Sequence, residues 1–207
     1  MRPLDVRSRR LTFIVTTVFA AIVMPLALEV HRSGGPLRID LRSYHALYHY
    51  QLPTWIGGPV QDLGNWVPFV SGIGILTTSS LILQDNFSAA VSVAGPPLAV
   101  LITEGILKPI VGPQENGVYG FPSGHATALA ALVAGVALLV YRRWGIGALL
   151  AAAPFLLLLP LLMTIGLVQT HWHQMSDAIA GDLIGTGTVF GIAWALSVGI
   201  ARRQARR

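Results

Sequence analysis

The 207-residue chain contains no cysteine and few charged residues. Without cysteine it cannot form a disulfide framework, a thiolate metal site or a cysteine nucleophile. Only 11% of the residues are charged, less than half of the roughly 25% typical of soluble domains. This composition excludes a soluble enzyme, a disordered segment and a nucleic-acid-binding arm. Hydrophobic residues make up 53% of the chain, and we expect residues 1–207 to form a single domain.

Long apolar runs dominate the sequence. A helix needs roughly 20 largely apolar residues to cross a bilayer core, and six stretches approach that length. They are Leu11–Leu28, Trp66–Leu83, Phe87–Leu107, Ser123–Tyr141, Ile146–Val168 and Ala178–Ala201. The first could be a signal peptide, but it is long and no small-residue cleavage site follows, so we interpret it as a retained helix. The sequence predicts an all-α integral membrane protein, a bundle of six transmembrane helices.

The positive charges indicate how this bundle is oriented. Ten of the fourteen belong to one set of helix ends: Arg2, Arg7, Arg9, Arg10, Arg142, Arg143, Arg202, Arg203, Arg206 and Arg207. Arg32, Arg38, Arg42 and Lys108 belong to the other set. The positive-inside rule therefore predicts a multi-pass cell-membrane protein with both termini cytoplasmic. We expect the basic tails, residues 1–10 and 202–207, to attract anionic lipid headgroups rather than nucleic acid.

All six histidines fall on the predicted external side: His31, His45, His49, His125, His171 and His173. The external segment, residues 31–65, is too long for a simple turn. Helical spacing of Leu41, Tyr44, Leu47 and Tyr48 predicts a short amphipathic helix, either at the membrane interface or packed over the bundle as a lid. Gly181 and Gly185 form a small-xxx-small pair, which we expect to pack helices within the chain.

An anion site is predicted where the fourth apolar run begins, at Pro122-Ser123-Gly124-His125. Ser123 can cap this helix, and Gly124 lets the backbone approach a ligand closely. Free N–H groups at the helix start then attract an anion. An ordinary helix cap would explain Ser123, but it would not explain a histidine inside an apolar helix, where ionisable groups are costly.

Further ionisable residues lie at the predicted external ends of the other helices. Asp177 lies four residues after His173, so it can bond one ring nitrogen and leave the other for attack or proton transfer; a solvated polar pair is the alternative. Lys108, the only lysine, can supply a cation to a phosphate or pair with Glu104. A zinc site would use His125, His171, His173 and Asp177. No HExxH motif or cysteine supports zinc, so we expect neither a metal nor a cofactor.

The order lysine, Pro-Ser-Gly-His, His-x-x-x-Asp resembles the phosphatidic acid phosphatase type 2 superfamily, over roughly Lys108 to Ile184. The resemblance implies that His173 is the nucleophile that accepts the phosphoryl group and that Asp177 orients it. It implies that His125 protonates the leaving alkoxide and later activates water. Phosphate binding would fall to Lys108, Ser123 and the Gly124 N–H.

The chain departs from the family pattern at both phosphate-binding arginines. Glu115 and Asn116 stand where the first motif has Arg-Pro, and Gly166 and Leu167 stand where the third has Ser-Arg. The loss of two bidentate donors weakens binding of a dianionic phosphate. We hypothesise that Arg38 or Arg42 from the external segment, or a protonated His171, takes their place.

These residues lead to a main functional hypothesis and two alternatives. The first is a membrane phosphatase that hydrolyses a polyprenyl- or glycerolipid-type phosphate or pyrophosphate at the outer leaflet through a phosphohistidine. The second is a divergent, catalytically weak or inactive subunit that binds lipid or a partner membrane protein. The third is another chemistry on the same scaffold, such as headgroup transfer or hydrolysis by Ser123.

Overall fold

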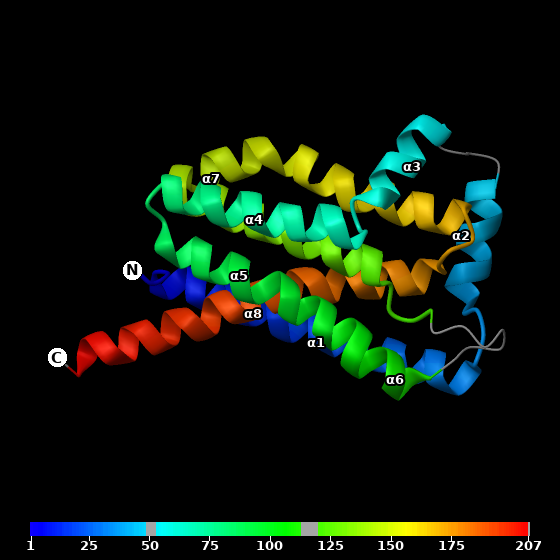
Figure 1. The fold of residues 1–207 in the computed structure, drawn as a ribbon. Helices are drawn as coiled ribbons and strands as arrows, with labels where there is room; N and C mark the ends of the chain where they lie inside the picture. Colours follow the sequence, from blue (N-terminus) through cyan, green and yellow to red (C-terminus); the bar gives the residue numbers. More distant parts are fainter. Residues whose placement is uncertain (49–52, 113–119, 207) are drawn as a thin grey trace.

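The computed structural model describes residues 1–48, 53–112 and 120–206, and no strand occurs among them. The helices form a bundle crossed at one end by α2 (Figure 1). Their bounds are α1 Val6–Ser33, α2 Arg38–Tyr48, α3 Thr54–Asp62, α4 Trp66–Ile82, α5 Asn86–Val100, the π-helix η1 Leu101–Leu107, α6 Lys108–Val111, α7 Gly124–Gln169 and α8 Met175–Ala205. The predicted all-α class is confirmed.

Within the described residues, four helical stretches are long and apolar enough to cross a membrane: α1, Asn86–Val111, α7 and α8. The apolar helix α4 has 17 residues. α7 has 46 residues but contains a break at Gly145, whose φ of 83° only glycine adopts readily. As one straight rod it would measure about 70 Å at 1.5 Å per residue, more than twice a bilayer core. Its two arms instead fold back beside each other (Figure 1).

Glycines bring α7 and α8 into backbone contact. A Cβ at Gly181 would lie 2.5 Å from the Ser123 carbonyl oxygen, and one at Gly185 would collide with the carbonyl oxygen of Thr127. Such close approach of helix backbones is the usual role of small residues four apart in membrane proteins. The pair therefore packs helices within the chain, as predicted.

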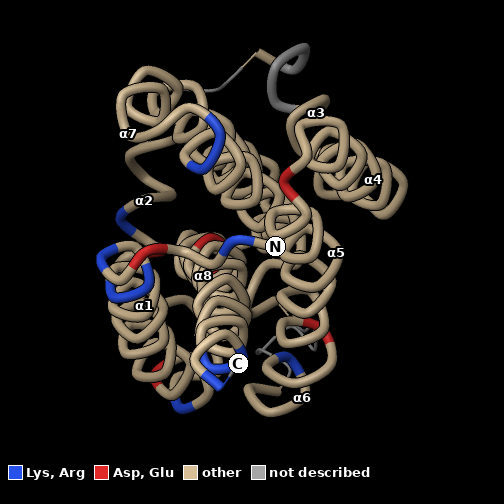
Figure 2. The backbone as a smooth tube through the Cα atoms, turned by 90° about the vertical axis from the view of Figure 1, so that its left-hand side faces the viewer, with Lys and Arg blue, Asp and Glu red and all other residues tan. Residues whose placement is uncertain are grey.

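The two ends of the bundle differ in composition. The basic end holds both termini and the turn within α7 (Figure 1); Arg142 Nη2 donates to the Arg2 carbonyl (3.1 Å) and the Leu4 N–H to Ser197 Oγ (2.7 Å). Figure 2 looks onto this end and shows Lys and Arg near both termini and on α7. The histidine end holds α2, α3, α6 and the starts of α7 and α8 (Figure 1).

The predicted segment between the first two apolar runs contains α2 and α3. α2 packs against α7 and α8: its Asp40 is 2% exposed, and the Tyr44 and His171 rings lie 5.1 Å apart. A helix is thus present where the spacing predicts one. Of the histidines, His49 lies outside the described residues.

Asp85, at the basic end, joins the start of α5 to Arg142. Its carboxylate accepts Arg142 Nε–H (2.8 Å) and Nη2–H (3.0 Å), and it caps α5 by accepting the Ser88 N–H (3.2 Å). Arg142 also lies 4.3 Å from the centre of the Phe87 ring. Burial raises the pKa of Asp85, but the hydrogen bonds from Arg142 and Ser88 outweigh it and hold the pKa below its usual value.

We expect Asp85→Asn to lower the free energy of unfolding by about 2 kcal/mol at neutral pH, because Arg142 keeps its charge and loses its partner. A carboxylate with a lowered pKa stabilises the fold above its unfolded pKa and stops doing so as pH falls through the folded value. The deficit of the variant should therefore shrink in acid. Thermal unfolding in detergent, followed from neutral pH down through the folded pKa of Asp85, measures this deficit. The control is Glu29→Gln, an exposed residue of α1. A deficit that is absent at neutral pH, or constant in acid, would contradict the expectation.

Candidate active site

The candidate active site lies at the histidine end, where the starts of two long helices meet. The Ser123 N–H donates to the Asp177 carbonyl oxygen (2.9 Å), which ties the start of α7 to the first turn of α8. Ser123 is fully buried, and its Oγ caps α7 by accepting the Ala126 N–H (3.4 Å). The predicted cap is therefore present.

His173 and Asp177 form the predicted pair at the start of α8. Asp177 Oδ2 lies 3.4 Å from His173 Nδ1, at the outer limit of a hydrogen bond, and it also accepts the Gln174 N–H (3.0 Å). Asp177 is 1% exposed. Its negative charge suits the positive end of the helix dipole. Because the carboxylate engages Nδ1, Nε2 of His173 is the nitrogen left for chemistry.

His125 stands half-buried in the first turn of α7. Its Nε2 lies 3.1 Å from Asn65 Oδ1, and its ring contacts Trp172 with centroids 5.6 Å apart. Lys108 begins α6 and His173 lies just before α8, so both belong to the same end of the bundle as His125 (Figure 1). The structure thus places these three ionisable groups, which come from different parts of the chain, at one end of the bundle.

Lys108 forms the alternative contact that the sequence allows, an ion pair with Glu104. Lys108 Nζ lies 2.8 and 2.9 Å from the two Glu104 oxygens. Glu104 belongs to the π-helix η1, a helix type frequent at functional sites. A Cβ added to Gly124 would collide with Glu104 Oε1. The carboxylate therefore lies against the first turn of α7, where the sequence predicts an anion.

Three predicted binding residues are exposed at the surface. Arg38 and Arg42 are exposed on α2. His171 is exposed, has a left-handed backbone (φ 59°) and packs against Tyr44. Within the described ranges, no hydrogen bond or ion pair joins any of the three to the cluster, and no group of three or more His, Asp or Glu side chains is placed to hold a metal ion.

The positions of the missing arginines have different surroundings. Leu167 is fully buried in an apolar cluster with Met163 and Ala178. A Cβ at Gly166 would lie 3.0 Å from Gln61 Nε2, so α3 fills the space beside this position. Glu115 and Asn116 lie outside the described residues.

The sequence motifs did not include several side chains that form hydrogen bonds at the site. Asp40 accepts the Ser176 N–H (2.7 Å) and Oγ–H (2.9 Å) and so caps α8 from a different helix. Asn65, in the turn between α3 and α4, contacts His125 and donates a hydrogen bond to Asp62 at the end of α3. The only signal for Asp40 was a lone acid in an amphipathic stretch, and Asn65 reads as an ordinary helix cap.

Comparison with known proteins decides the family. The family model of the PAP2 superfamily matches residues 70–202, which include both the Pro-Ser-Gly-His motif and the His173–Asp177 pair. The chain belongs to the PAP2 superfamily. The resemblance predicted from the motifs is confirmed, and no curated protein matches the sequence.

The fold is also that of a solved PAP2 protein. The crystal structure of the first transmembrane PAP2-type phosphatidylglycerolphosphate phosphatase from Bacillus subtilis is similar, with a TM-score of 0.68. The match covers 91% of this chain and 96% of that one at 15% identity, so it shows a shared fold. Together with the apolar helices, the PAP2 fold supports a multi-pass membrane protein and, at a general level, a lipid phosphatase.

Proposed function

We propose that this PAP2 protein hydrolyses a lipid-linked phosphate or pyrophosphate, of polyprenyl or glycerolipid type, through a phosphohistidine. The observation that carries the proposal is the His173–Asp177 pair at the start of α8, which a backbone hydrogen bond from Ser123 to Asp177 ties to the first turn of α7, where His125 stands. An activated imidazole, a second imidazole and an ammonium group are the parts that phosphoryl transfer needs, because it depends mainly on positioning and charge stabilisation.

The reaction follows from the hydrogen bonds at each ring. Asp177 accepts the Nδ1–H of His173, so the Nε2 lone pair attacks phosphorus. The bond to the leaving oxygen breaks, and His125 gives that oxygen a proton. His125 then takes a proton from the water that hydrolyses the phosphohistidine, which releases phosphate and restores both rings. Lys108 and the N–H groups of the first α7 turn neutralise the phosphate oxygens.

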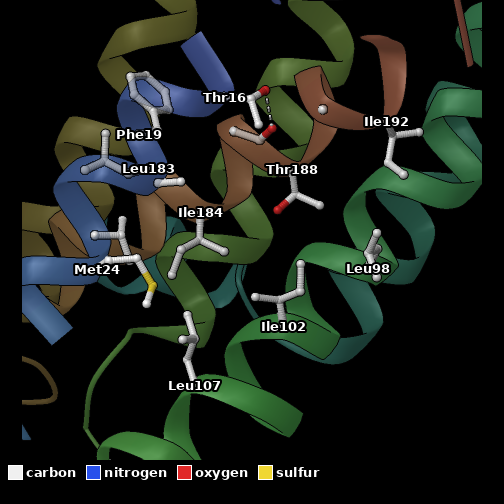
Figure 3. A pocket seen from close by; sticks show the side chains of 14 residues that line it. Thr16, Phe19, Met24, Leu98, Ile102, Leu107, Leu183, Ile184, Thr188 and Ile192 are labelled. Atoms are coloured by element: carbon white, nitrogen blue, oxygen red, sulfur yellow. Dashed lines mark hydrogen bonds between the residues drawn. The ribbon is translucent and has the colours of Figure 1, made fainter. Parts of the chain in front are cut away.

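An apolar pocket supports a substrate with a hydrocarbon tail. It has a volume of about 350 Å³ and lies between α1, the α5–η1 stretch and α8. Figure 3 shows Phe19, Ile102 and Ile184 lining it from these three elements. Its lining includes none of the candidate site residues, but it includes Leu107, which precedes Lys108. A tail in this pocket would thus lie beside the residue that binds its headgroup.

The bilayer arrangement belongs to the same proposal. We place six spans in the membrane by counting α4 and the two arms of α7 separately, and the positive-inside rule puts the basic end in the cytoplasm. The histidine end then faces the outer leaflet. When the lipid binds, Arg38, Arg42 or a protonated His171 supplies the phosphate contacts that Gly166 and Leu167 lack.

The test is phosphate release from polyprenyl, diacylglycerol and soluble phosphates by the full chain in detergent. We expect His173→Ala to lower kcat/KM at least 10³-fold, because it removes the nucleophile. The control is His45→Ala, an exposed histidine on α2, which should keep wild-type activity. Release that persists undiminished in His173→Ala would refute the mechanism.

A second candidate function is that of an inactive subunit that binds lipid. It is favoured by the apolar surroundings of Leu167 and by the carboxylate against Gly124. No release from any substrate, with equal lipid binding by wild type and His173→Ala, would select it. A serine hydrolase is disfavoured because Ser123 is fully buried and its Oγ caps α7.

A further inference from the structure

We infer that Asn65, hydrogen-bonded to Asp62, is a positioning residue for His125: it engages the Nε2–H of the ring, so the proton that the leaving group receives comes from Nδ1. The inference rests on the proposed function of His125 as the acid. Both residues lie outside the family motifs, some sixty positions before His125. Asn65, in the turn between α3 and α4, contacts the His125 ring, and Asp62, at the end of α3, contacts Asn65.

The first observation is a helix cap that Asn65 does not make. Asn65 occupies the N-cap position of α4, yet its side chain makes no hydrogen bond to that helix. Asparagine at this position usually accepts a backbone N–H of the first turn. Here its Oδ1 faces His125 Nε2 at 3.1 Å instead. The Asn65 side chain therefore contacts the imidazole of His125 instead of a backbone N–H of α4.

The second observation settles the direction of the hydrogen bonds. Asn65 Nδ2 lies 3.0 Å from Asp62 Oδ1, and a carboxylate oxygen accepts hydrogen bonds. The amide therefore donates to Asp62 and presents its carbonyl oxygen to His125. His125 must then carry a proton on Nε2. The chain of donors runs from His125 through Asn65 to Asp62.

The ring of His125 is also held between two surfaces. On the α3–α4 turn, a Cβ at Gly64 would lie 2.7 Å from His125 Cα, Cβ and Cδ2. On the α7–α8 link, Trp172 contacts the ring at an interplanar angle of 68°. Glycine at position 64 thus permits the approach of the turn that delivers Asn65, and this packing leaves the ring little freedom to rotate.

The charged groups around His125 come from α3, η1, α6 and the α7–α8 link. Asp62 on α3 and Glu104 on η1 are negative, whereas Lys108 on α6 and His173 on the α7–α8 link are positive when protonated. Asp62, through Asn65, is the carboxylate on the hydrogen-bond chain that leads from the ring. Removing Asn65 or Asp62 should therefore destabilise the protonated ring of His125. The loss of activity at high pH should then begin at a lower pH than in the wild type.

The experiment compares substrates that need a proton with one that does not. Asn65→Ala should lower kcat/KM for a lipid alkyl phosphate by roughly tenfold to a hundredfold, because the acid is misplaced. For an aryl phosphate with a good leaving group, kcat/KM should change less than threefold. Asp62→Asn should show the same pattern more weakly, and both should shift the basic limb of the alkyl-phosphate profile to lower pH. Asn86→Ala, an exposed residue at the basic end, is the control.

Two outcomes overturn the inference: an unchanged kcat/KM for the alkyl phosphate in Asn65→Ala, or equal losses for both substrates, which would indicate only damaged structure. A wild-type protein without activity would instead refute the proposed function. In that case ¹⁵N spectra of the histidine rings still test the positioning. Asn65→Ala should alter the Nε2–H signal that His125→Ala removes, and an unaltered signal would overturn the inference.

Discussion

Gly181→Ala is expected to cost about 3 kcal/mol of stability and roughly 100-fold in phosphatase activity. The added Cβ would lie 2.5 Å from the Ser123 carbonyl oxygen, 2.9 Å from Ala126 Cβ and 3.1 Å from the Thr127 N–H nitrogen. Two of these neighbours are backbone atoms of α7, which cannot turn aside as a flexible side chain can. The strain of overpacking a rigid contact is typically 1–3 kcal/mol.

The loss of activity follows from what the contact holds in place. Ser123 caps α7, and its N–H bonds to Asp177 in the first turn of α8. Pushing α8 away from α7 therefore moves the proposed nucleophile, His173, relative to the proposed acid, His125. A displacement of about 1 Å in an active site can cost 100-fold in rate.

The matched control is Gly199→Ala in the same helix, where nothing lies within 4 Å of the added Cβ. That change should stabilise α8 by up to about 1 kcal/mol, because alanine favours helices over glycine. The two substitutions thus have opposite expected signs in thermal unfolding. If Gly181→Ala unfolds at the wild-type temperature and keeps wild-type phosphate release, α7 and α8 are not held by this contact.

The local parts of the site were predictable from the sequence. His173 and Asp177 are four residues apart, as are Glu104 and Lys108, so the short spacing in the sequence is enough to predict each pair, although His173 itself lies just before α8. Apolar length predicted the long helices, and the distribution of arginines predicted that both termini share one end with the turn of α7. These signals need no knowledge of how the helices pack.

The long-range contacts were not predictable. Asp40 reaches Ser176 across 136 positions, and Asn65 reaches His125 across 60. Helices that are apolar on every side carry little periodic signal of which face meets which neighbour. The rotation of α7 and α8, set by glycines at their contact, decides these partners. For the same reason the sequence did not reveal that Gln61 of α3 packs against Gly166.

Glu104→Gln is expected to tighten phosphate binding about tenfold. In the wild type, both Glu104 oxygens hold the Lys108 ammonium, and one lies against Gly124 in the first turn of α7. A substrate phosphate that binds there must displace a like charge. Such repulsion is worth about 4 kcal/mol at 4 Å near a protein surface and about 1 kcal/mol in water. Because the Glu104 side chain is 45% exposed, we expect an effect near the lower figure.

Inhibition by inorganic phosphate measures this change without a lipid substrate, and Glu29→Gln on exposed α1 controls for the loss of one negative charge elsewhere. Lys108→Gln should act in the opposite direction, because it removes the cation that the phosphate needs. If Glu104→Gln weakens phosphate binding instead, then Glu104 serves to hold Lys108 in position for the substrate. If binding tightens, the carboxylate occupies the position that the phosphate takes, and substrate binding must release Lys108 from it.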